Sequence, residues 1–353
     1  MEKEISMVSL FEKFVKDTQK GKRRKFTGER IKPRSAENLV PTLHLLKDYE
    51  NYRHKPLLVK VNLKRDRAKR LAERRYWQEF YRKFTDYLQF KRKCYDNYTG
   101  QAFKHIKCFF RYLKNERMLN INDFYEGFYV RREKIRIITL LPEQLYYLIK
   151  NDEFKKKLSR YGRYSCDMLI FGCITALRFS DLMNIKIRDI EKKQGGYFLY
   201  YRSLKTDAPA YVKLPRFAVD IFLKYSFKKP AEHTLFWKLS LSNFNANLKR
   251  IAAKAGWKDP IGKFRGRDGE PKEIKRPGGR GYRFCDLMSS HIMRRTGITI
   301  LLMMGMPEVL VRKISGHSAN SHEFFRYVDF AQSFITDEIE KAHAKLLELT
   351  ILA

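Results

Sequence analysis

Apolar residues recur at helix spacing along most of this chain, which predicts a mainly helical protein. In the first half the pattern covers residues 10–20, 35–52, 64–90 and about 100–115. The third of these segments carries a stripe of large apolar residues with basic residues between them, at Leu71, Trp77, Phe80, Phe84 and Leu88. Such a stripe is more typical of a core face than of a platform on which bases stack.

The second half adds strands to this helical pattern. Residues 197–205 and 210–214 read as two strands around the turn TDAP, and helices resume near residue 216. Residues 258–283 are rich in Gly, Pro and charge, so we expect a loop or an irregular hairpin there. The predicted fold class is therefore mainly α with a small antiparallel sheet.

Length and a basic run suggest where the chain divides. At 353 residues the chain is long enough for two cores. A basic run, RREKIR at 131–136, precedes LLPEQL, where Pro142 suits a helix start. We predict a helical domain over 1–130, a basic linker over 131–139 and a second domain over 140–353.

Charge points to a polyanionic partner. The net charge is +35, and both halves are basic, with 36 Lys and Arg against 17 Asp and Glu up to residue 137 and 38 against 22 beyond it. A surface that is basic only for solubility is the alternative. No apolar run reaches bilayer length, the first residues do not resemble a signal peptide, and five cysteines show no paired spacing. We therefore expect a reduced, cytoplasmic protein without a membrane partner.

Candidate DNA contacts follow from this charge. The helix near 100–115 has an apolar face, and the basic residues on its other side predict contacts to base edges in a major groove or, more safely for lysine, to phosphates. The run KRPGGRGYR either lies along phosphates or forms a mobile surface loop. The candidates are Lys104, His105, Lys107, Arg111, Arg280 and Arg283.

An ordered series of motifs in the second half carries the chemistry. ALRFSDL, HIMRRT, GH and a later tyrosine supply Arg178, His291, Arg294, His317 and Tyr327. Guanidinium groups match the charge that develops on an attacked phosphate, and a tyrosine can attack in place of water and keep the phosphate as a covalent ester. Each motif is weak alone, but their order and spacing are specific.

Around these residues stand two further candidates. Lys205, at the strand turn, is a compact cationic donor suited to act as a general acid for the departing 5′ hydroxyl. Asp181 lies three residues after Arg178, where it either braces the site or forms a structural salt bridge. No paired acidic set for two magnesium ions and no phosphate-binding loop ending in GKS or GKT is present, so we expect neither a metal nor another cofactor, and no ATP.

From Leu140 onward the chain resembles the tyrosine recombinases, also called phage-type integrases, and looks most similar to integrases of bacterial mobile elements. The resemblance rests on ALRFSDL, SLKT with VKLP after it, SSHIMRRT, ISGH and FRYV. It implies a helical, SAM-like core-binding domain and a catalytic domain that close around double-stranded DNA. It also implies a bacterial protein, bound to the nucleoid when on DNA, that recombines specific sites through a 3′-phosphotyrosine.

The resemblance assigns a role to each motif residue. It implies that Arg178 and Arg294 bind the scissile phosphate, that Lys205 is the general acid and that Asp181 supports the site. His291 would assist proton transfer, and His317 would bond a phosphate oxygen. Tyr327 would be the nucleophile, although it lies ten residues after His317, one more than is usual in the family. We expect the turn SANSHE to hold the extra residue.

The end of the chain predicts assembly. Residues 333–350 read as an amphipathic helix with Phe334, Ile335, Ile339, Leu346 and Leu347 on its apolar side. In the family, such a helix commonly docks on a neighbouring protomer, which implies a tetramer on DNA; packing on its own domain is the alternative. Two other functions remain open at this point, namely a type IB topoisomerase and a DNA-binding regulator without catalysis, since residues 300–317 could pass for a helix-turn-helix.

Overall fold

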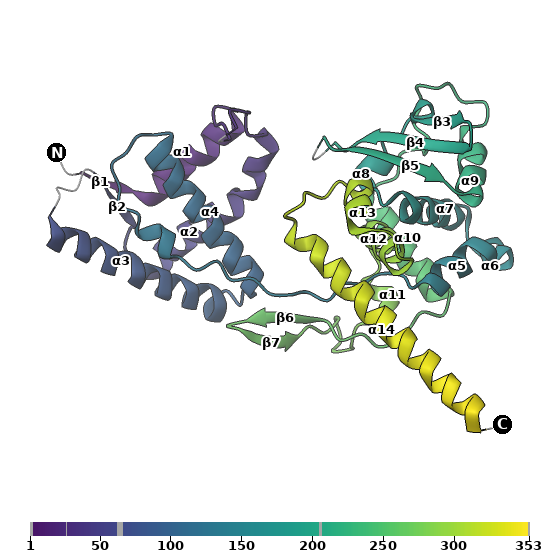
Figure 1. Cartoon of the computed structure of the whole chain (residues 1–353). Coiled ribbons are helices and arrows are strands. Elements are labelled where there is room, and N and C mark those ends of the chain that lie inside the picture. Colours follow the sequence, from purple (N-terminus) through teal and green to yellow (C-terminus); the bar gives the residue numbers. More distant parts are fainter. Residues whose placement is uncertain (1–2, 26, 62–65, 205–206, 352–353) are drawn as a thin grey trace. The chain divides into compact units, whose positions relative to one another are not determined.

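The computed structural model describes residues 3–25, 27–61, 66–204 and 207–351. Figure 1 follows the chain through two compact units. Unit 1 comprises residues 1–135 together with 264–274, and unit 2 comprises residues 136–263 together with 275–353. The chain first passes from unit 1 to unit 2 within the stretch 131–139 that the sequence marks as basic. None of the described helices is long and apolar enough to span a bilayer.

Unit 1 is a helical bundle. Its helices are α1 (Met7–Gln19), α2 (Val40–Arg53), α3 (Arg67–Asp86) and α4 (Asp96–Asn115). Short turns accompany them at η1 (Pro33–Asn38), η2 (Tyr87–Lys91) and η3 (Phe124–Gly127), and two strands that the periodicity did not predict, β1 (Lys3–Ser6) and β2 (Leu58–Val61), pair antiparallel.

An aromatic core holds unit 1 together. Trp77 is 1% exposed and packs against Phe80, Phe110 and Phe124 with ring centroids 4.8–5.4 Å apart. Burial of each such ring contributes about 1.5–3 kcal/mol. The stripe in α3 is therefore a core face, as expected, except at Leu71, which is 47% exposed. Leu71 precedes Trp77 by six residues, which at 3.6 residues per turn places it on a different side of the helix.

Unit 2 is mainly helical with one small sheet. Its helices are α5 (Pro142–Lys150), α6 (Asp152–Lys156), α7 (Arg160–Thr175), α8 (Phe179–Leu182), α9 (Arg216–Ser226), α10 (Leu241–Lys254), α11 (Phe284–Leu287), α12 (His291–Met303), α13 (Glu308–Ser315) and α14 (His322–Ile351). A short turn, η4 (Ile187–Asp189), leads into β3 (Ile190–Lys193), β4 (Gly196–Arg202) and β5 (Pro209–Leu214). These strands form an antiparallel sheet in the order β3-β4-β5, so the two predicted strands gain an unpredicted neighbour in β3.

Close packing of α7 on α12 forms the centre of unit 2. Gly297 of α12 faces α7, where a β-carbon would meet the carbonyl oxygen of Cys173. Met293, also on α12, is fully buried next to Gly172. The two helices can approach this closely because a glycine lies at each contact. This packing also positions the residues of α12 that precede Gly297.

Residues 258–283 contain a regular hairpin that belongs to unit 1. Strands β6 (Phe264–Arg267) and β7 (Glu270–Glu273) pair antiparallel around Asp268 and Gly269, whose φ angles are 54° and 80°. Two positive φ values are typical of the Asp-Gly turn of a tight hairpin. The amide groups of both turn residues donate to the carboxylate of Asp96 on α4, at 3.1 and 2.9 Å.

Further contacts hold the hairpin against unit 1. The Gly266 amide donates to Glu133, and Arg267 donates to the Lys93 carbonyl at 2.9 Å. Arg131 lies 3.3 Å from the Asp268 carboxylate. The hairpin is therefore bonded to unit 1 through both its backbone and its side chains.

Replacing Asp96 with Ala should loosen this hairpin. Asp96 is 5% exposed and also accepts from Gln89 at 2.7 Å, so its loss leaves three donors without their acceptor. We expect a local cost of about 1–3 kcal/mol. Amide hydrogen exchange at residues 268 and 269 should then accelerate roughly 10- to 100-fold.

Asp123→Ala is the matched control, because it removes an exposed carboxylate of unit 1 that pairs with Lys114. Exchange at the hairpin should not change in this variant. Unchanged exchange in the Asp96 variant would show that the side-chain anchor is dispensable.

Candidate active site

The first arginine of the motif series stands on a short turn of unit 2. Helix α7 ends at Thr175, Ala176 takes a left-handed conformation with φ 51°, and Arg178 then caps the start of α8. It is therefore a turn, and not α7 itself, that presents this guanidinium. Nη1 of Arg178 donates to the Ser203 hydroxyl at 3.0 Å and lies 3.7 Å from the Asp181 carboxylate.

Asp181 is a buried acceptor that joins this turn to the sheet. It is 1% exposed and accepts from the Tyr201 hydroxyl at 2.9 Å, the Ser203 hydroxyl at 3.2 Å and the Leu204 amide at 3.3 Å. Burial, together with the Asp181 charge, raises the pKa of Tyr201, so this phenol stays protonated and donates. The carboxylate thus fixes the end of β4 relative to Arg178.

Lys205 follows directly after this fixed segment. It lies outside the described residues, so the structure gives no position for its side chain. The Leu204 amide, one residue earlier, is bonded to Asp181.

Arg294 is the most deeply buried cation of the site. It is 3% exposed on α12, and its guanidinium donates to the Ala176 carbonyl at 3.1 Å and to the Ser315 carbonyl. Burial, followed by the nearby charge of Arg178, lowers its pKa to about 10. Arg294 remains a cation at neutral pH and joins the end of α7 to the end of α13.

His317 lies next to this guanidinium. Its ring nitrogens are each 3.3 Å from Nη2 of Arg294, and Nδ1 is 2.8 Å from the Ser315 hydroxyl. Burial, followed by the charges of Arg294 and Arg178, lowers the pKa of His317 to about 3. The imidazole is therefore neutral at physiological pH and acts here as a hydrogen-bonding group rather than as a cation.

Tyr327 also lies next to His317. Helix α13 ends at Ser315, Gly316 takes a left-handed φ of 61°, and α14 begins at His322. Tyr327 is 5% exposed, and its ring centroid is 5.9 Å from that of His317. The six residues between the two helices, 316–321, include only the first four residues of the turn SANSHE, whose His322 and Glu323 already belong to α14.

His291 stands at the first position of α12. Its side chain is exposed, whereas Arg294 on the next turn is buried. His291 is among the charged neighbours that lower the pKa of His317, which places it near the same site. The structure therefore brings together Arg178, Asp181, His291, Arg294, His317 and Tyr327 in unit 2.

The candidate DNA contacts on α4 need one correction. His105 is 8% exposed, with Nδ1 2.8 Å from the Thr42 hydroxyl and Nε2 2.5 Å from Gln101, and burial lowers its pKa to about 4. It is a core histidine, so the expectation that it reads a base is wrong. The 3.6-residue period turns it toward α2, away from the exposed Lys104.

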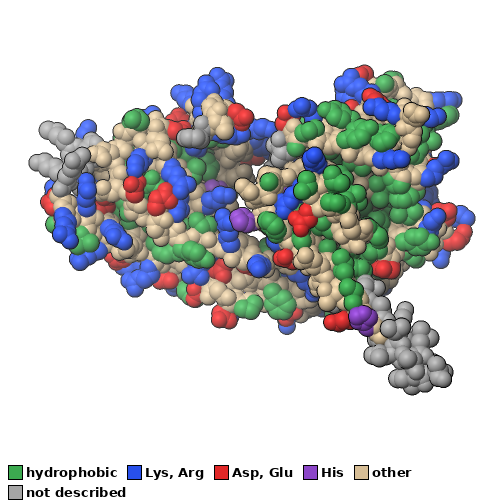
Figure 2. Space-filling view, in the orientation of Figure 1, with side chains coloured by type: hydrophobic (Ala, Val, Ile, Leu, Met, Phe, Trp, Pro, Cys, Tyr) green, Lys and Arg blue, Asp and Glu red, His purple; other side chains and the backbone are tan. Residues whose placement is uncertain are grey.

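The remaining basic candidates differ in their surroundings. Lys107 and Arg111 both pair with Glu126 of η3, at 3.4 and 2.8 Å. Arg283 pairs with Asp286 at 3.1 Å at the start of α11, and Arg280 is exposed. Figure 2 shows Lys and Arg side chains spread over the visible face of both units.

Three polar residues of the site were missed at the sequence level: Tyr201, Ser203 and Ser315. Alternation along β4 could have marked Tyr201 as inward-facing, and Ser315 stands directly before the Gly-His motif. Ser203 carries no such signal. Among the described residues, no group of three or more His, Cys, Asp or Glu side chains is gathered in the manner of metal ligands.

Comparisons with solved structures support this architecture. The Tn1549 transposon integrase in complex with a circular intermediate DNA superposes with a TM-score of 0.56 at 13% identity, over 92% of this chain and 94% of that one. The XerH site-specific recombinase bound to palindromic difH matches with a TM-score of 0.57 at 13% identity, over 96% and 84%. A lambda integrase dimer bound to a COC′ core site gives 0.55 at 12% identity, over 92% and 77%.

At these identities the likeness shows the fold. No curated protein matches the chain. The model of the phage integrase family matches residues 140–333, more than half of the chain and the whole stretch that carries Arg178, Arg294, His317 and Tyr327. This protein belongs to the phage integrase family, the site-specific tyrosine recombinases that cut and rejoin DNA.

Proposed function

We propose that Tyr327 cleaves the DNA strand by attacking a phosphodiester. A bond forms between the phenol oxygen and phosphorus, and the bond from phosphorus to the 5′ oxygen breaks. The products are a 3′-phosphotyrosine and a free 5′ hydroxyl, and a 5′ hydroxyl from a partner strand reverses the step. Since the ester conserves the phosphodiester bond energy, rejoining needs no ATP.

The two arginines, Arg294 buried and Arg178 partly exposed, carry this proposal. Arg294 is 3% exposed, and Arg178 lies close enough that its charge, in addition to burial, lowers the pKa of Arg294. Arg294 also contacts the neutral His317, and the ring of Tyr327 lies beside that histidine. Cations fixed in a site of low polarity stabilise the charge that accumulates on the attacked phosphate more than they stabilise the substrate.

The other side chains complete the proton transfers in this proposal. His291 takes the phenol proton as the bond forms, and Lys205 protonates the departing 5′ oxygen. His317, neutral in this site, donates a hydrogen bond to a phosphate oxygen. Cations thereby provide the charge stabilisation, and we assign no metal ion or organic cofactor to the reaction.

Replacing Tyr327 with Phe should abolish the covalent adduct and leave DNA binding within about twofold of wild type. Only the nucleophilic oxygen is removed, and the ring still fills its place in the core. Adduct formation on a nicked suicide duplex, run on a denaturing gel in EDTA, measures the effect.

Tyr129→Phe is the control, since that tyrosine is exposed and lies in unit 1. It should form adduct at the wild-type rate. An adduct that persists in the Tyr327 variant, or one that appears only with added magnesium, would overturn the proposal.

Asp181 acts in this proposal as a positioning residue. Its three bonds hold the end of β4, one residue ahead of Lys205, and its carboxylate also orients Ser203 against Arg178. An error of about 1 Å in such groups lowers catalysis by roughly 10²-fold.

Asp181→Asn should therefore lower the cleavage rate about 10²-fold while the Kd for DNA stays close to wild type. A substrate with a 5′-bridging phosphorothiolate, whose leaving group needs no proton, should recover most of that loss because it bypasses Lys205. Asp220→Asn, at an exposed ion pair with Arg216, is the matched control. Equal losses on both substrates would contradict a role in placing Lys205.

Assembly on DNA is the next part of the proposal. A pocket of about 1070 Å³ lies beside Arg178 and His317, and Tyr211, Met306, Val309 and Leu310 give it an apolar lining. Val309 is 64% exposed and Leu310 is 47% exposed. An apolar surface of this kind next to a catalytic site favours a protein partner.

We propose that the tail of a second copy fills this pocket. Helix α14 continues from Tyr327 to Ile351 and extends beyond the other helices of unit 2 (Figure 1), with Ile335 and Ile339 37% and 50% exposed. Leu346 and Leu347 lie outside the described side chains. Docking in trans supports a tetramer on two duplexes; packing on its own unit is the alternative.

Ile339→Lys should prevent assembly on DNA with two sites and retain binding to one site, because an ammonium group would lose its water in the apolar part of the pocket and meet the cations Arg178, Arg312 and Lys313 that also line it. Sedimentation of protein–DNA complexes measures this change. Ser333→Lys, at an exposed position on a different side of α14, should assemble normally. Normal assembly of the Ile339 variant would favour packing on its own unit.

The proposed DNA contacts include the exposed Lys104 and Arg280. Lys107, Arg111 and Arg283 pair with carboxylates in this structure, and we propose that DNA phosphates replace these partners on binding. We further propose that the enzyme serves a bacterial mobile element, by integrating and excising it. Inversion of a DNA segment uses the same chemistry, and only the orientation of the two sites distinguishes these outcomes.

A further inference from the structure

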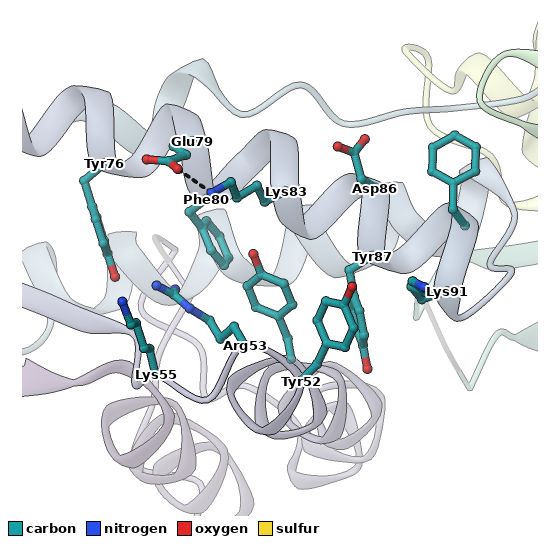
Figure 3. Close-up of a pocket in the computed structure, with 12 residues that line it drawn as sticks. Tyr52, Arg53, Lys55, Tyr76, Glu79, Phe80, Lys83, Asp86, Tyr87 and Lys91 are labelled. Carbon is teal, nitrogen blue, oxygen red and sulfur yellow. Dashed lines mark ion pairs between the residues drawn. The ribbon is translucent and has the colours of Figure 1, made fainter.

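Unit 1 contains an aromatic pocket between α2 and α3 to which the recombination chemistry assigns no role. Figure 3 shows side chains from the end of α2 and from α3 converging on it. Its volume is about 630 Å³, within the range of roughly 300–1,000 Å³ typical of small-ligand sites. Its lining is half aromatic, with Tyr49, Tyr52, Tyr76, Phe80, Tyr87 and Phe90.

Two of these aromatic rings are exposed, although the others are packed. Tyr49 and Tyr87 are buried and 5.2 Å apart, and Tyr52 packs on Tyr87 with ring centroids 4.9 Å apart. Tyr52 is nevertheless 52% exposed, and Phe90 is 57% exposed. The pocket therefore offers aromatic surface to solvent beside a pair of buried tyrosines.

An uncommon backbone turn positions the second of these rings. After α3 the chain makes a π-type turn at η2, in which the Arg92 amide bonds to the Tyr87 carbonyl at 2.9 Å. This turn contains Phe90 and Lys91, which both line the pocket. Such turns are rare and are often found at functional sites.

The rim of the pocket is cationic. Lys83 pairs with Glu79 at 2.6 Å, and Arg53 lies over the Tyr49 ring at 5.8 Å. Lys55 and Lys91 are exposed, and neither forms an ion pair within the described part of the chain. Exposed aromatic rings beside unpaired ammonium groups match a nucleotide, because the rings stack on the base and the cations bind its phosphates.

We propose that this pocket binds one unpaired nucleotide of single-stranded DNA. A base within a duplex has both faces covered by its neighbours, so only an unstacked base can lie on Tyr52 or Phe90. A recombinase that exchanges strands must break base pairs at the exchange point before new pairs form. Unpaired nucleotides are thus produced by the reaction itself, and a stacking site offsets part of the few kcal/mol that unstacking costs.

One carboxylate of the rim gives the proposal a base preference. Asp86 lines the pocket and forms no ion pair among the described residues. It repels phosphate, but it can accept a hydrogen bond from the exocyclic amino group of cytosine, adenine or guanine. Thymine has no such group, so it should bind most weakly.

The test compares single-stranded with duplex DNA on the full chain. Fluorescein-labelled dC8, dT8 and a duplex of the same length are titrated, and anisotropy gives each Kd. The ratio of the single-strand to the duplex Kd is the readout, because a chain of net charge +35 binds any DNA to some extent.

Tyr52→Ala combined with Phe90→Ala should weaken dC8 binding at least about 10-fold, with duplex binding within about twofold. Lys55→Ala combined with Lys91→Ala should reduce the salt slope for dC8 by about 1.4, as two lost phosphate contacts on a single strand require. Asp86→Asn should remove the preference for dC8 over dT8.

Three controls separate stacking from general charge and from misfolding. Lys13→Ala combined with Lys20→Ala removes two exposed charges of unit 1 away from the pocket and should leave the ratio unchanged. Tyr129→Ala removes an aromatic ring, 66% exposed, outside the pocket. The single variant Tyr52→Trp keeps an aromatic ring at this position, so it should retain dC8 binding. It therefore tests the stacking surface in a folded protein if the double alanine variant unfolds.

Mapping of the contact completes the test. Single strands carrying 5-iododeoxycytidine, crosslinked by light and analysed by mass spectrometry, should label Tyr52 or Phe90. Labelling confined to other parts of the chain, or an unchanged ratio in the aromatic variant, would overturn the proposal. Loss of self-association in that variant, with dC8 binding intact, would instead assign the pocket to a protein contact. Tyr327→Phe should bind dC8 normally, so this result is independent of the proposed nucleophile.

Discussion

The site depends on a guanidinium taken out of water. Arg294 is 3% exposed, and such burial is tolerated because two backbone carbonyls, those of Ala176 and Ser315, accept its hydrogen bonds. These carbonyls belong to the ends of different helices, α7 and α13, where the backbone no longer bonds within the helix. One side chain of α12 therefore bonds to the ends of two other helices.

The rest of the site follows from this constraint. The close contact of α7 with α12 at Gly297 brings Arg294 to the end of α7, and the left-handed turn at Ala176 leads directly to Arg178. On the other side, the end of α13 holds Ser315 and His317 against the same guanidinium. A second buried network, centred on Asp181, connects Arg178 to the sheet. Burial, followed by the charges of Arg294 and Arg178, then lowers the pKa of His317 and keeps its imidazole neutral.

The sequence predicted which residues gather at the site better than it predicted how they are held there. Motif order identified the residues that gather in unit 2, because phosphoryl transfer needs cations for the phosphate and a nucleophile, and these residue types can be read from the sequence. It could not reveal that Asp181 accepts from Tyr201, since that contact depends on strand register. His105 and Leu71 were assigned to the wrong side of their helices. Adjacent residues lie about 100° apart on a helix, so His105 is buried although Lys104 is exposed, and Leu71, six residues before Trp77, lies on another side of α3. The Asp-Gly turn in residues 264–273 was readable in principle, but not its attachment to Asp96.

The bonding of the β6–β7 hairpin to Asp96 also affects the order in which the two units can fold during synthesis. Unit 1 acquires its last strands, β6 and β7, only from residue 264 onward, after residues 136–263 of unit 2 have already been synthesised. Until then the buried carboxylate of Asp96 has no hairpin amides to bind. The first domain is thus not a portable segment that ends near residue 135, and exchange of domains between relatives would have to carry a piece of sequence from within the second.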